Sequence, residues 1–273
     1  MSRNQRIKQL REDFLSGIGV PEPSEFKVDK FQSDAISSVV AGHDTLVVAP
    51  TGSGKTYIAT EAISAYLSMG TKSVYTTPLK ALSNTKYNEL GKLFGDRAEV
   101  GLLTGDRKIE VDAQVIVATT EIYRNELYRS QQRFGLVVLD EVHFIADAQR
   151  GPVWEESIIL TSRDTALLML SASISNSREI ADWIEDVRNK PCTIITETAR
   201  PVALRYGFLH PDLGVLPLRD EKGRLLKEIS GYYGQSGLDS SGTRLKGGPF
   251  KRGRGDGGKR GGFRGRNTRR PKK

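Results

Sequence analysis

The chain has 273 residues, of which 37% are hydrophobic and 27% charged, enough for one large folded domain or two small ones. Its net charge of +8 is uneven, because residues 244–273 hold 13 Lys and Arg against one acid, whereas residues 1–243 hold 28 basic and 32 acidic residues. A single cysteine, Cys192, excludes an intrachain disulfide, and the chain lacks both the ~18-residue apolar run of a membrane span and a secretion signal, so we expect a cytoplasmic protein.

Short runs of β-branched and apolar residues predict seven strands. Most stretches between them repeat apolar residues with a helical period, as in TYIATEAISAYL and ALSNTKYNELGKLF. Continuous apolar strands separated by helices favour an α/β fold with a mostly parallel sheet covered on both faces. Such sheets bind ligands at the carboxyl ends of their strands, so functional side chains are expected directly after them. The predicted strands are 45–49, 73–77, 99–103, 114–118, 136–140, 166–170 and 193–197.

The segment APTGSGKT, residues 49–56, follows the first predicted strand and opens a predicted helix. Gly52 and Gly54 let the backbone turn tightly, so that successive N–H groups point at phosphate oxygens. Lys55 would reach the β- and γ-phosphates of ATP, and the Thr56 hydroxyl would bind Mg²⁺. Ala49 stands where the general pattern begins with Gly. The predicted ATP-binding loop consists of Ala49, Pro50, Thr51, Gly52, Ser53, Gly54, Lys55 and Thr56.

The segment LDEVH, residues 139–143, ends the most apolar predicted strand. Asp140 can hold Mg²⁺ through water, and Glu141 can orient or deprotonate an attacking water. Alone, an Asp-Glu pair after a strand is usually a solvated turn. Together with the ATP-binding loop it predicts phosphoryl-transfer chemistry, with Lys55, Asp140 and Glu141 as the catalytic residues. We interpret His143 as a coupling residue, with an ordinary core histidine as the alternative.

With these two motifs the chain resembles a superfamily-two DExH helicase. A more specific segment, RGPVWEE at 150–156, resembles the superkiller-type RNA helicases, the exosome-associated group. Residues 189–211 are similar to the end of their first RecA-like motor domain. Further segments that match in order are TTPLKALSNTKYNEL (76–90), LLTGD (102–106), ATTEIYRNELY (118–128) and SAS (171–173).

The resemblance implies roles for residues outside the two motifs. Coupling would involve Ser171 and Ser173, where the family usually has Thr at the second position and the hydroxyl is kept. In similar helicases an aromatic residue stacks on adenine and a glutamine reads its edge, which maps to Phe26 and Gln32. The Gln32 amide can both donate and accept there. Phe26 could equally be an ordinary core aromatic.

The resemblance also implies contacts with single-stranded RNA through loops that follow strands. In the family such loops grip the sugar-phosphate backbone, which gives affinity without sequence readout. Lys80 and Arg124 would be the phosphate partners. For each threonine the alternative is a helix N-cap, and the two roles are geometrically compatible. The predicted contact residues are Pro78, Leu79, Lys80, Thr104, Gly105, Asp106, Thr119, Thr120, Glu121 and Arg124.

The resemblance to the helicase family and the composition together predict four segments along the chain. A helical lead-in at 1–23 precedes the RecA-like domain at 24–211. An extension at 212–234 is expected to form a short strand pair and one helix, and 235–273 reads as a disordered Gly/Arg/Lys-rich tail or inter-domain linker. Such a basic tail indicates a polyanionic partner, with a solubilising extension as the alternative.

Residues 261–266, GGFRGR, are similar to the arginine-finger motif by which a second RecA-like domain completes a DExH motor. The Gln of that motif is absent, and no strand or helix pattern surrounds the segment, so we interpret it as part of the tail. A second RecA-like domain is then expected in trans or in a longer chain.

The sequence therefore predicts the motor domain of an ATP-dependent RNA helicase that binds Mg²⁺-ATP and is weak or inactive in isolation. Two alternatives stay open: a non-motor nucleic-acid-binding module that keeps a nucleotide pocket, and a DNA helicase of a related branch. The VWEE segment favours the RNA branch, and turnover would separate a motor from a binding module.

Overall fold

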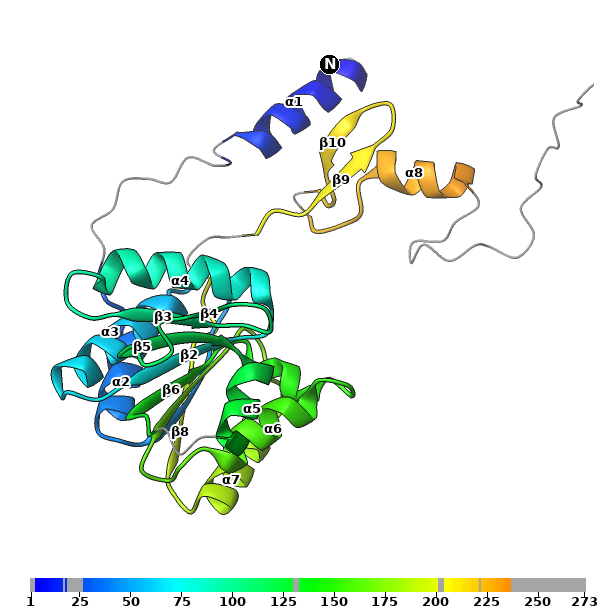
Figure 1. The fold of residues 1–273 in the computed structure, drawn as a ribbon. Helices are drawn as coiled ribbons and strands as arrows, with labels where there is room; N and C mark the ends of the chain where they lie inside the picture. Colours follow the sequence, from blue (N-terminus) through cyan, green and yellow to red (C-terminus); the bar gives the residue numbers. More distant parts are fainter. Residues whose placement is uncertain are drawn as a thin grey trace, which may run out of the picture. The chain divides into compact units, whose positions relative to one another are not determined.

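A computed structural model describes residues 3–16, 18, 27–129, 133–200, 204–220 and 222–236 (Figure 1). The chain divides into two compact units. The larger spans residues 22–203, and the smaller unites the residues up to 21 with those from 204 onward. In the described part of the chain, none of the helices has the length and apolar character that crossing a membrane requires.

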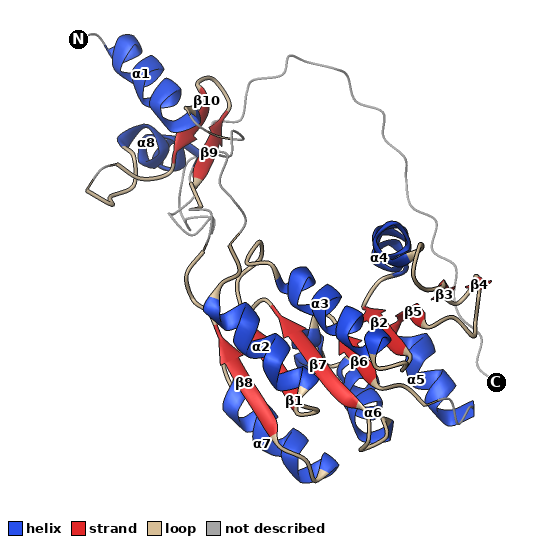
Figure 2. Ribbon diagram, turned by 90° about the vertical axis from the view of Figure 1, so that its left-hand side faces the viewer, coloured by secondary structure: helices blue, strands red, loops and turns tan. Residues whose placement is uncertain are grey.

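The larger unit is built on an eight-stranded sheet with the strand order β4-β3-β5-β2-β6-β7-β1-β8 (Figure 2). Every neighbouring pair is parallel except β3 and β4. The strands are β1 Asp44–Val48, β2 Ser73–Thr77, β3 Val100–Leu103, β4 Lys108–Ile109, β5 Val115–Thr119, β6 Leu136–Leu139, β7 Ala166–Ser171 and β8 Cys192–Thr196.

Helices cover both faces of this sheet. Successive strand residues point to opposite faces, so Val47 and Tyr75 pack under one helical layer and Leu46 and Val74 under the other. The expected α/β fold with a mostly parallel sheet is confirmed. One face carries α2 Lys30–Val40, α3 Lys55–Ser68 and α4 Lys80–Phe94; the other carries α5 Thr120–Arg129, α6 Gly151–Leu160 and α7 Ser177–Arg188, with the 3₁₀ helix η1 Val142–Ala146 after β6.

A buried ion pair ties the start of β1 to the end of α7. Arg188 Nε donates to Asp44 Oδ2 at 2.5 Å, and both side chains are almost fully buried. Asp44 Oδ1 also accepts the Leu167 N–H at 2.9 Å. The rest of the guanidinium donates to main-chain carbonyls around the end of α6, including that of Thr161 at 2.7 Å. Because so many donors and acceptors are matched, the buried charges are compensated.

The smaller unit contains α1 Arg3–Leu15, the antiparallel strands β9 Gly207–His210 and β10 Gly214–Pro217, and α8 Lys227–Ser236. Its apolar centre is formed by Ile7, Leu216, Leu226 and Ile229. Of the strand pair and helix expected at 212–234, only β10 and most of α8 lie in that range. The other strand, β9, lies before the boundary expected after Pro211, and α8 continues into the expected tail. Residues 237–273, which hold most of that tail, lie outside the described residues.

Candidate nucleotide and nucleic-acid site

The phosphate loop, residues 49–56, connects β1 to α3, as the sequence predicts. Gly52 and Gly54 have φ of +87° and +83°, which is the left-handed region that glycine enters without strain. The Ser53 hydroxyl donates to the Pro50 carbonyl at 2.8 Å and braces the turn. A glycine turn of this kind before a long helix is suited to binding a phosphate anion.

Lys55 begins α3, and its ammonium group lies back over its own loop. Nζ donates to the carbonyl oxygens of Ala49 at 2.7 Å and Pro50 at 3.0 Å. Burial lowers the pKa of Lys55, while the charges of Glu141 and Asp140 act against that shift. The phosphate loop follows β1 and the two carboxylates of LDEVH follow β6, and only β7 lies between these strands, so both groups lie at the same edge of the sheet.

Gln32 lies in the first turn of α2 and is buried against the phosphate loop. Its Oε1 accepts the Asp29 N–H at 3.0 Å, and its Nε2 donates to the Ser53 carbonyl at 3.0 Å. Both ends of the amide that was expected to read adenine are thus engaged within the chain. The adenine contact stays a prediction, and Phe26, its expected aromatic partner, lies outside the described residues.

Asp140 and Glu141 follow β6 directly. Asp140 Oδ1 accepts the Glu141 N–H at 2.9 Å, and Oδ2 accepts the Tyr75 hydroxyl at 2.7 Å. Burial, and then the charge of Asp140, raise the pKa of Tyr75, so this hydroxyl stays a proton donor. Glu141 has a φ of +52°, an uncommon conformation for a residue with a side chain. A fixed Asp140 and a sharply turned Glu141 are what the sequence places at this strand end.

His143 links Glu141 to an aromatic column. Its Nδ1 lies 3.2 Å from Glu141 Oε2, which is the distance of an ion pair or a hydrogen bond. The His143 ring stacks on Phe144 with centroids 4.8 Å apart, and Phe144 stacks on the buried Trp154 at 5.5 Å. The RGPVWEE segment therefore packs against the DEVH turn through its tryptophan.

The SAS segment at the end of β7 lies beside the start of the phosphate loop. The Ala49 N–H donates to the Ser171 carbonyl at 3.0 Å, and the Ser171 side chain is buried. Ser171 Oγ accepts the Ser173 N–H at 3.3 Å, while the Ser173 side chain is exposed. Of the two serines expected to couple the sites, Ser171 thus contacts the phosphate loop directly, and Ser173 is bonded to Ser171.

The oxygen atoms gathered here fit a Mg²⁺-nucleotide. Hydroxyl and carboxylate oxygens, such as those of Thr56 and Asp140, are ligands that Mg²⁺ prefers, and phosphate-bound Mg²⁺ needs few protein ligands. Glu141 Oε2 is buried and lies 3.2 Å from His143 Nδ1, so its position is held by a neighbouring ring within the described residues. No group of three or more His, Cys, Asp or Glu among the described residues is arranged as a separate metal site.

The loops predicted to bind RNA follow β2, β3 and β5, which are adjacent in the sheet order β3-β5-β2. The structure therefore brings these loops to one edge. The Thr120 hydroxyl donates to the Thr77 carbonyl at 3.2 Å, and Lys80 of the β2 loop forms an ion pair with Asp106 of the β3 loop. Leu79, Lys80, Gly105 and Asp106 are exposed, whereas Pro78 is buried and Glu121 half-buried.

The threonines of these loops are buried and used within the chain. Thr104 Oγ1 donates to Asp106 Oδ1 at 2.9 Å. Thr119 Oγ1 accepts the Ile122 N–H at 3.4 Å, as an N-cap would. Arg124 NH1 donates to Glu156 Oε2 at 2.8 Å. The two cations expected to contact phosphate are each paired with an acid, Lys80 with Asp106 in an exposed pair and Arg124 with Glu156 in a half-buried one. Contacts with a sugar-phosphate backbone would therefore come chiefly from main-chain groups and from the more exposed Lys80.

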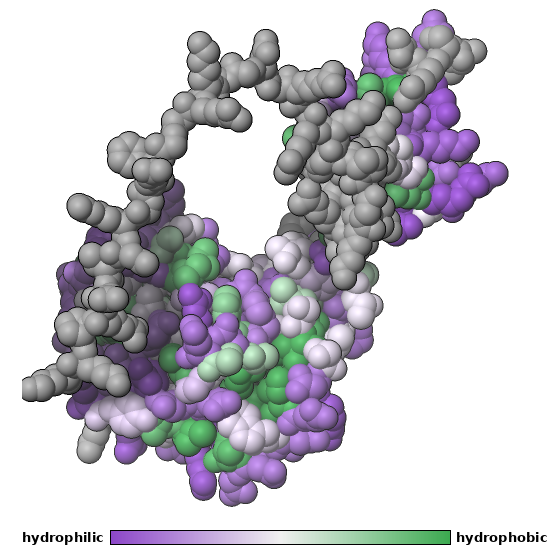
Figure 3. Space-filling view, turned by 90° about the vertical axis from the view of Figure 1, so that its right-hand side faces the viewer, coloured by the Kyte–Doolittle hydropathy of each residue, from purple (hydrophilic) through white to green (hydrophobic). Residues whose placement is uncertain are grey.

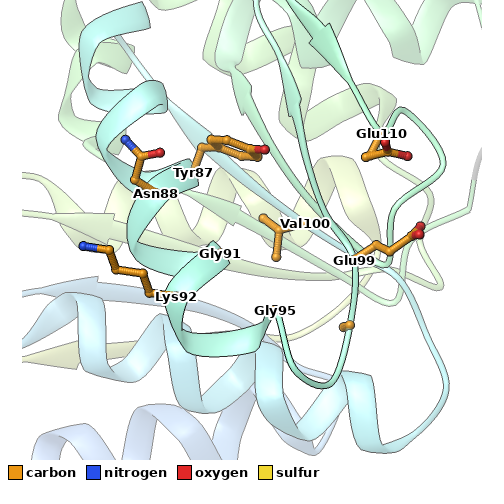
Figure 4. A pocket seen from close by; sticks show the side chains of 9 residues that line it. Tyr87, Asn88, Gly91, Lys92, Gly95, Glu99, Val100 and Glu110 are labelled. Atoms are coloured by element: carbon orange, nitrogen blue, oxygen red, sulfur yellow. The ribbon is translucent and has the colours of Figure 1, made fainter.

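Two other surface features contain none of the predicted site residues. An open pocket of about 600 Å³ lies between α4 and β3, with Tyr87 and Val100 facing its interior (Figure 4). Figure 3 views the side on which α5 and α6 lie in Figure 1, and hydrophobic patches interrupt a mainly hydrophilic surface there. Exposed hydrophobic residues of these helices include Tyr128, Ile159 and Leu160.

A profile of the DEAD/DEAH box helicase family matches residues 29–181, more than half of the chain. The chain belongs to this family. The matched range includes the phosphate loop, DEVH, the SAS segment and the three loops after β2, β3 and β5. The helicase part of the sequence-based resemblance is thereby confirmed.

Relatives with high identity are much longer than this chain. The DExH-box ATP-dependent RNA helicase DExH15 of Arabidopsis thaliana, described as chloroplastic, is 44% identical over 237 residues, which are 81% of this chain and 20% of that protein. The probable helicase HelY of Mycobacterium leprae is 47% identical over 182 residues, which are 66% of this chain and 20% of that protein. The chain thus spans about a fifth of the length of the relatives it matches.

Among solved structures, the crystal structure of the DUF1998 helicase MrfA bound to DNA has a similar fold. The TM-score is 0.52 at 19% identity, over 72% of this chain and 30% of that one. Likeness at this identity shows the fold alone, and this fold is the expected RecA-like one.

The sequence motifs did not predict two residues that contact this site, Lys86 and Tyr75. Lys86 lies in the middle of α4 and donates to Thr56 Oγ1 at 3.3 Å. Tyr75 lies in the middle of β2, and its hydroxyl donates to Asp140 Oδ2. Neither stands in a phosphate-binding motif. The helical period of 80–94 could have indicated which face of α4 meets the sheet, but not that Lys86 reaches the phosphate loop.

Proposed function

We propose that this chain is the first RecA-like motor domain of a superkiller-type ATP-dependent RNA helicase, and that it binds Mg²⁺-ATP and single-stranded RNA. One observation carries the nucleotide part: Lys55 and the phosphate loop follow β1, and Asp140 and Glu141 follow β6, so they lie at the carboxyl ends of strands that only β7 separates in a parallel sheet. A cation for phosphates and two carboxylates for metal and water are the minimum set for phosphoryl transfer.

In this proposal each group has one task. Lys55 exchanges the carbonyls of Ala49 and Pro50 for phosphate oxygens, and Thr56 and Asp140 face the metal. Mg²⁺, when bound, would neutralise charge that develops on the phosphates. Glu141 orients the attacking water and accepts its proton, and His143, 3.2 Å from its carboxylate, couples that event to neighbouring segments.

RNA is the proposed nucleic acid for two reasons. The RGPVWEE segment resembles the superkiller-type RNA helicases, and the plant relative is described as an RNA helicase. The loops after β2, β3 and β5 offer main-chain groups and Lys80 to the backbone, which gives affinity without reading bases. The proposed range of the motor domain is 24–211, its proposed location is the cytoplasm, and its turnover would need a second RecA-like domain.

Direct binding tests this function. The purified chain should bind a fluorescent ATP analogue with Mg²⁺, and it should bind a single-stranded RNA more tightly than the same sequence in DNA. Nucleotide binding without any turnover, even when a second RecA-like domain is supplied, would favour the non-motor module. Preference for DNA would contradict the RNA assignment and leave the nucleotide assignment standing.

A further inference from the structure

Lys86 is a second lysine at the phosphate loop, and it lies beside Thr56, one of the two residues expected to bind Mg²⁺. We call the surroundings of Thr56 and Asp140 the metal side of the loop. Lys86 lies in the middle of α4, and only 17% of its side chain is exposed. Its Nζ donates to Thr56 Oγ1 at 3.3 Å and to Glu89 Oε2 at 2.7 Å. The long charged side chain is mostly buried, and oxygens from α3 and α4 hold its ammonium group, so the positive charge has a fixed position.

The same ammonium adjoins the other residue expected on the metal side. Nζ lies 5.9 Å from the centroid of the Tyr75 ring, and the Tyr75 hydroxyl donates to Asp140 Oδ2 at 2.7 Å. Lys86 is therefore placed between Thr56 and the Tyr75–Asp140 pair. Lys55 does not fill this place, since its Nζ is bound to the carbonyls of Ala49 and Pro50.

Two cations cannot share this place. The hydroxyl oxygen that accepts a hydrogen bond from Lys86 is the oxygen through which Thr56 would bind Mg²⁺. Like charges a few ångströms apart in a partly dehydrated site repel each other strongly. The second partner of Lys86 offers an escape, because Glu89 is half exposed and already holds the ammonium.

We propose that Lys86 is a built-in counter-cation of the nucleotide site, which occupies the metal side of Thr56 until Mg²⁺ displaces it towards Glu89. This rests on the proposed function, because it presumes that a Mg²⁺-nucleotide binds at the phosphate loop. Without Mg²⁺ the ammonium partly neutralises the phosphates. With Mg²⁺ it must be moved, so it lowers the affinity for the metal and makes nucleotide binding less dependent on Mg²⁺.

The test measures the dissociation constant of a fluorescent ADP analogue across a Mg²⁺ titration, and again in EDTA. Lys86→Met should lower the Mg²⁺ concentration at half-saturation by on the order of tenfold and weaken binding in EDTA. Lys86→Arg, which keeps the charge, should behave like the unmodified chain. Thermal unfolding without nucleotide shows that each variant is folded.

Glu89 provides a change of opposite sign. Glu89→Gln removes the alternative partner, so Lys86 should stay on Thr56 and the Mg²⁺ requirement should rise. Loss of a nearby negative charge would raise it too, so the double variant decides. If Glu89 acts through Lys86, Glu89→Gln should have no effect once Lys86 is Met.

Three results would overturn the proposal. Equal weakening by Lys86→Met with and without Mg²⁺ would make Lys86 an ordinary phosphate contact, and an unchanged Mg²⁺ titration would make it a structural residue. A full effect of Glu89→Gln in the Lys86→Met background would show that Glu89 acts on the metal directly. Failure of the unmodified chain to bind the nucleotide under any condition would instead contradict the proposed function.

Discussion

Gln32 and Gly54 are so close that a side chain on Gly54 would collide with the glutamine. A Cβ at Gly54 would lie 2.4 Å from Gln32 Nε2, the atom that donates to the Ser53 carbonyl. The start of α2 and the phosphate loop are thereby fixed as one element. Gly54 is needed for two separate reasons, its left-handed backbone and the space that Gln32 takes up.

Gly54→Ala should therefore lower the stability of the chain more than an alanine replacement at a glycine where only the left-handed backbone is strained. The left-handed conformation costs about 1–2 kcal/mol for a residue with a Cβ, and the collision adds displacement of Gln32. We expect a lower melting temperature and loss of nucleotide binding. Gly42 is the matched control, because its φ is +87° and a Cβ there meets nothing within 4 Å. Equal stability of Gly42→Ala and Gly54→Ala would show that the contact with Gln32 is unimportant.

The ion pair of Asp44 and Arg188 should stabilise the fold because each buried charge compensates the other. Arg188→Met removes the closest partner of the buried Asp44 and leaves it the longer ion pair with Lys190 Nζ at 3.5 Å. Breaking a buried pair typically costs about 3–5 kcal/mol, and because Lys190 remains we expect a loss towards the lower end of that range. Denaturant unfolding measures this loss. Adding Asp44→Asn to Arg188→Met should restore part of the stability, because the buried charge that Lys190 compensates only in part is then removed. A double variant less stable than Arg188→Met would contradict this account.

Glu141→Gln should separate nucleotide binding from turnover. The amide keeps the size of the side chain but cannot accept a proton, so ATP affinity should persist while any hydrolysis disappears. We expect the unmodified chain to hydrolyse slowly and to separate no strands, since an arginine finger from a second domain is worth about 10³–10⁵ in rate. Glu61→Gln, at an exposed position of α3, is the control for loss of charge. Robust unwinding by the chain alone would show that the motor is complete without a second domain.

Deleting residues 244–273, which lie outside the described residues, should weaken RNA binding and leave ATP affinity unchanged. Those residues hold 13 Lys and Arg. If about half of them engage phosphates, they contribute about −4 to −5 to the slope of log K for RNA binding against log salt concentration. The deletion should therefore make that slope less negative by this amount. A deletion that stops turnover but keeps RNA affinity would mean that GGFRGR at 261–266 acts as the arginine finger.

The sequence predicts the strands well because each is a continuous apolar run with turn residues at its ends. All seven predicted strands are present, with ends within one residue of the expected positions. The two-residue β4 is too short for any hydrophobic pattern, and β9 alternates too weakly to be separated from the preceding segment. The motifs likewise predict the tight turn at Gly52 and Gly54 and the position of Asp140 directly after β6, because backbone geometry at a strand end depends on neighbouring residues.

Contacts between distant segments could not be predicted in this way. Asp44 and Arg188 are 144 positions apart, and nothing near either residue specifies the other. Lys86 resembles any lysine of an amphipathic helix until the sheet order places α4 beside the phosphate loop. Gln32 was assigned to adenine by resemblance, whereas its partners in the structure are Asp29 and Ser53, which only the fold brings together.

The most direct test of the central claim is thermal unfolding with and without Mg²⁺-ATP. At a hundredfold excess over its dissociation constant, a ligand stabilises the folded state by about 2.7 kcal/mol, which corresponds to a rise of roughly 5–10 °C. Lys55→Ala should abolish that rise, and Lys92→Ala, at an exposed position of α4, should leave it intact. A melting temperature that rises equally in Lys55→Ala and the unmodified chain would contradict the nucleotide site at residues 49–56.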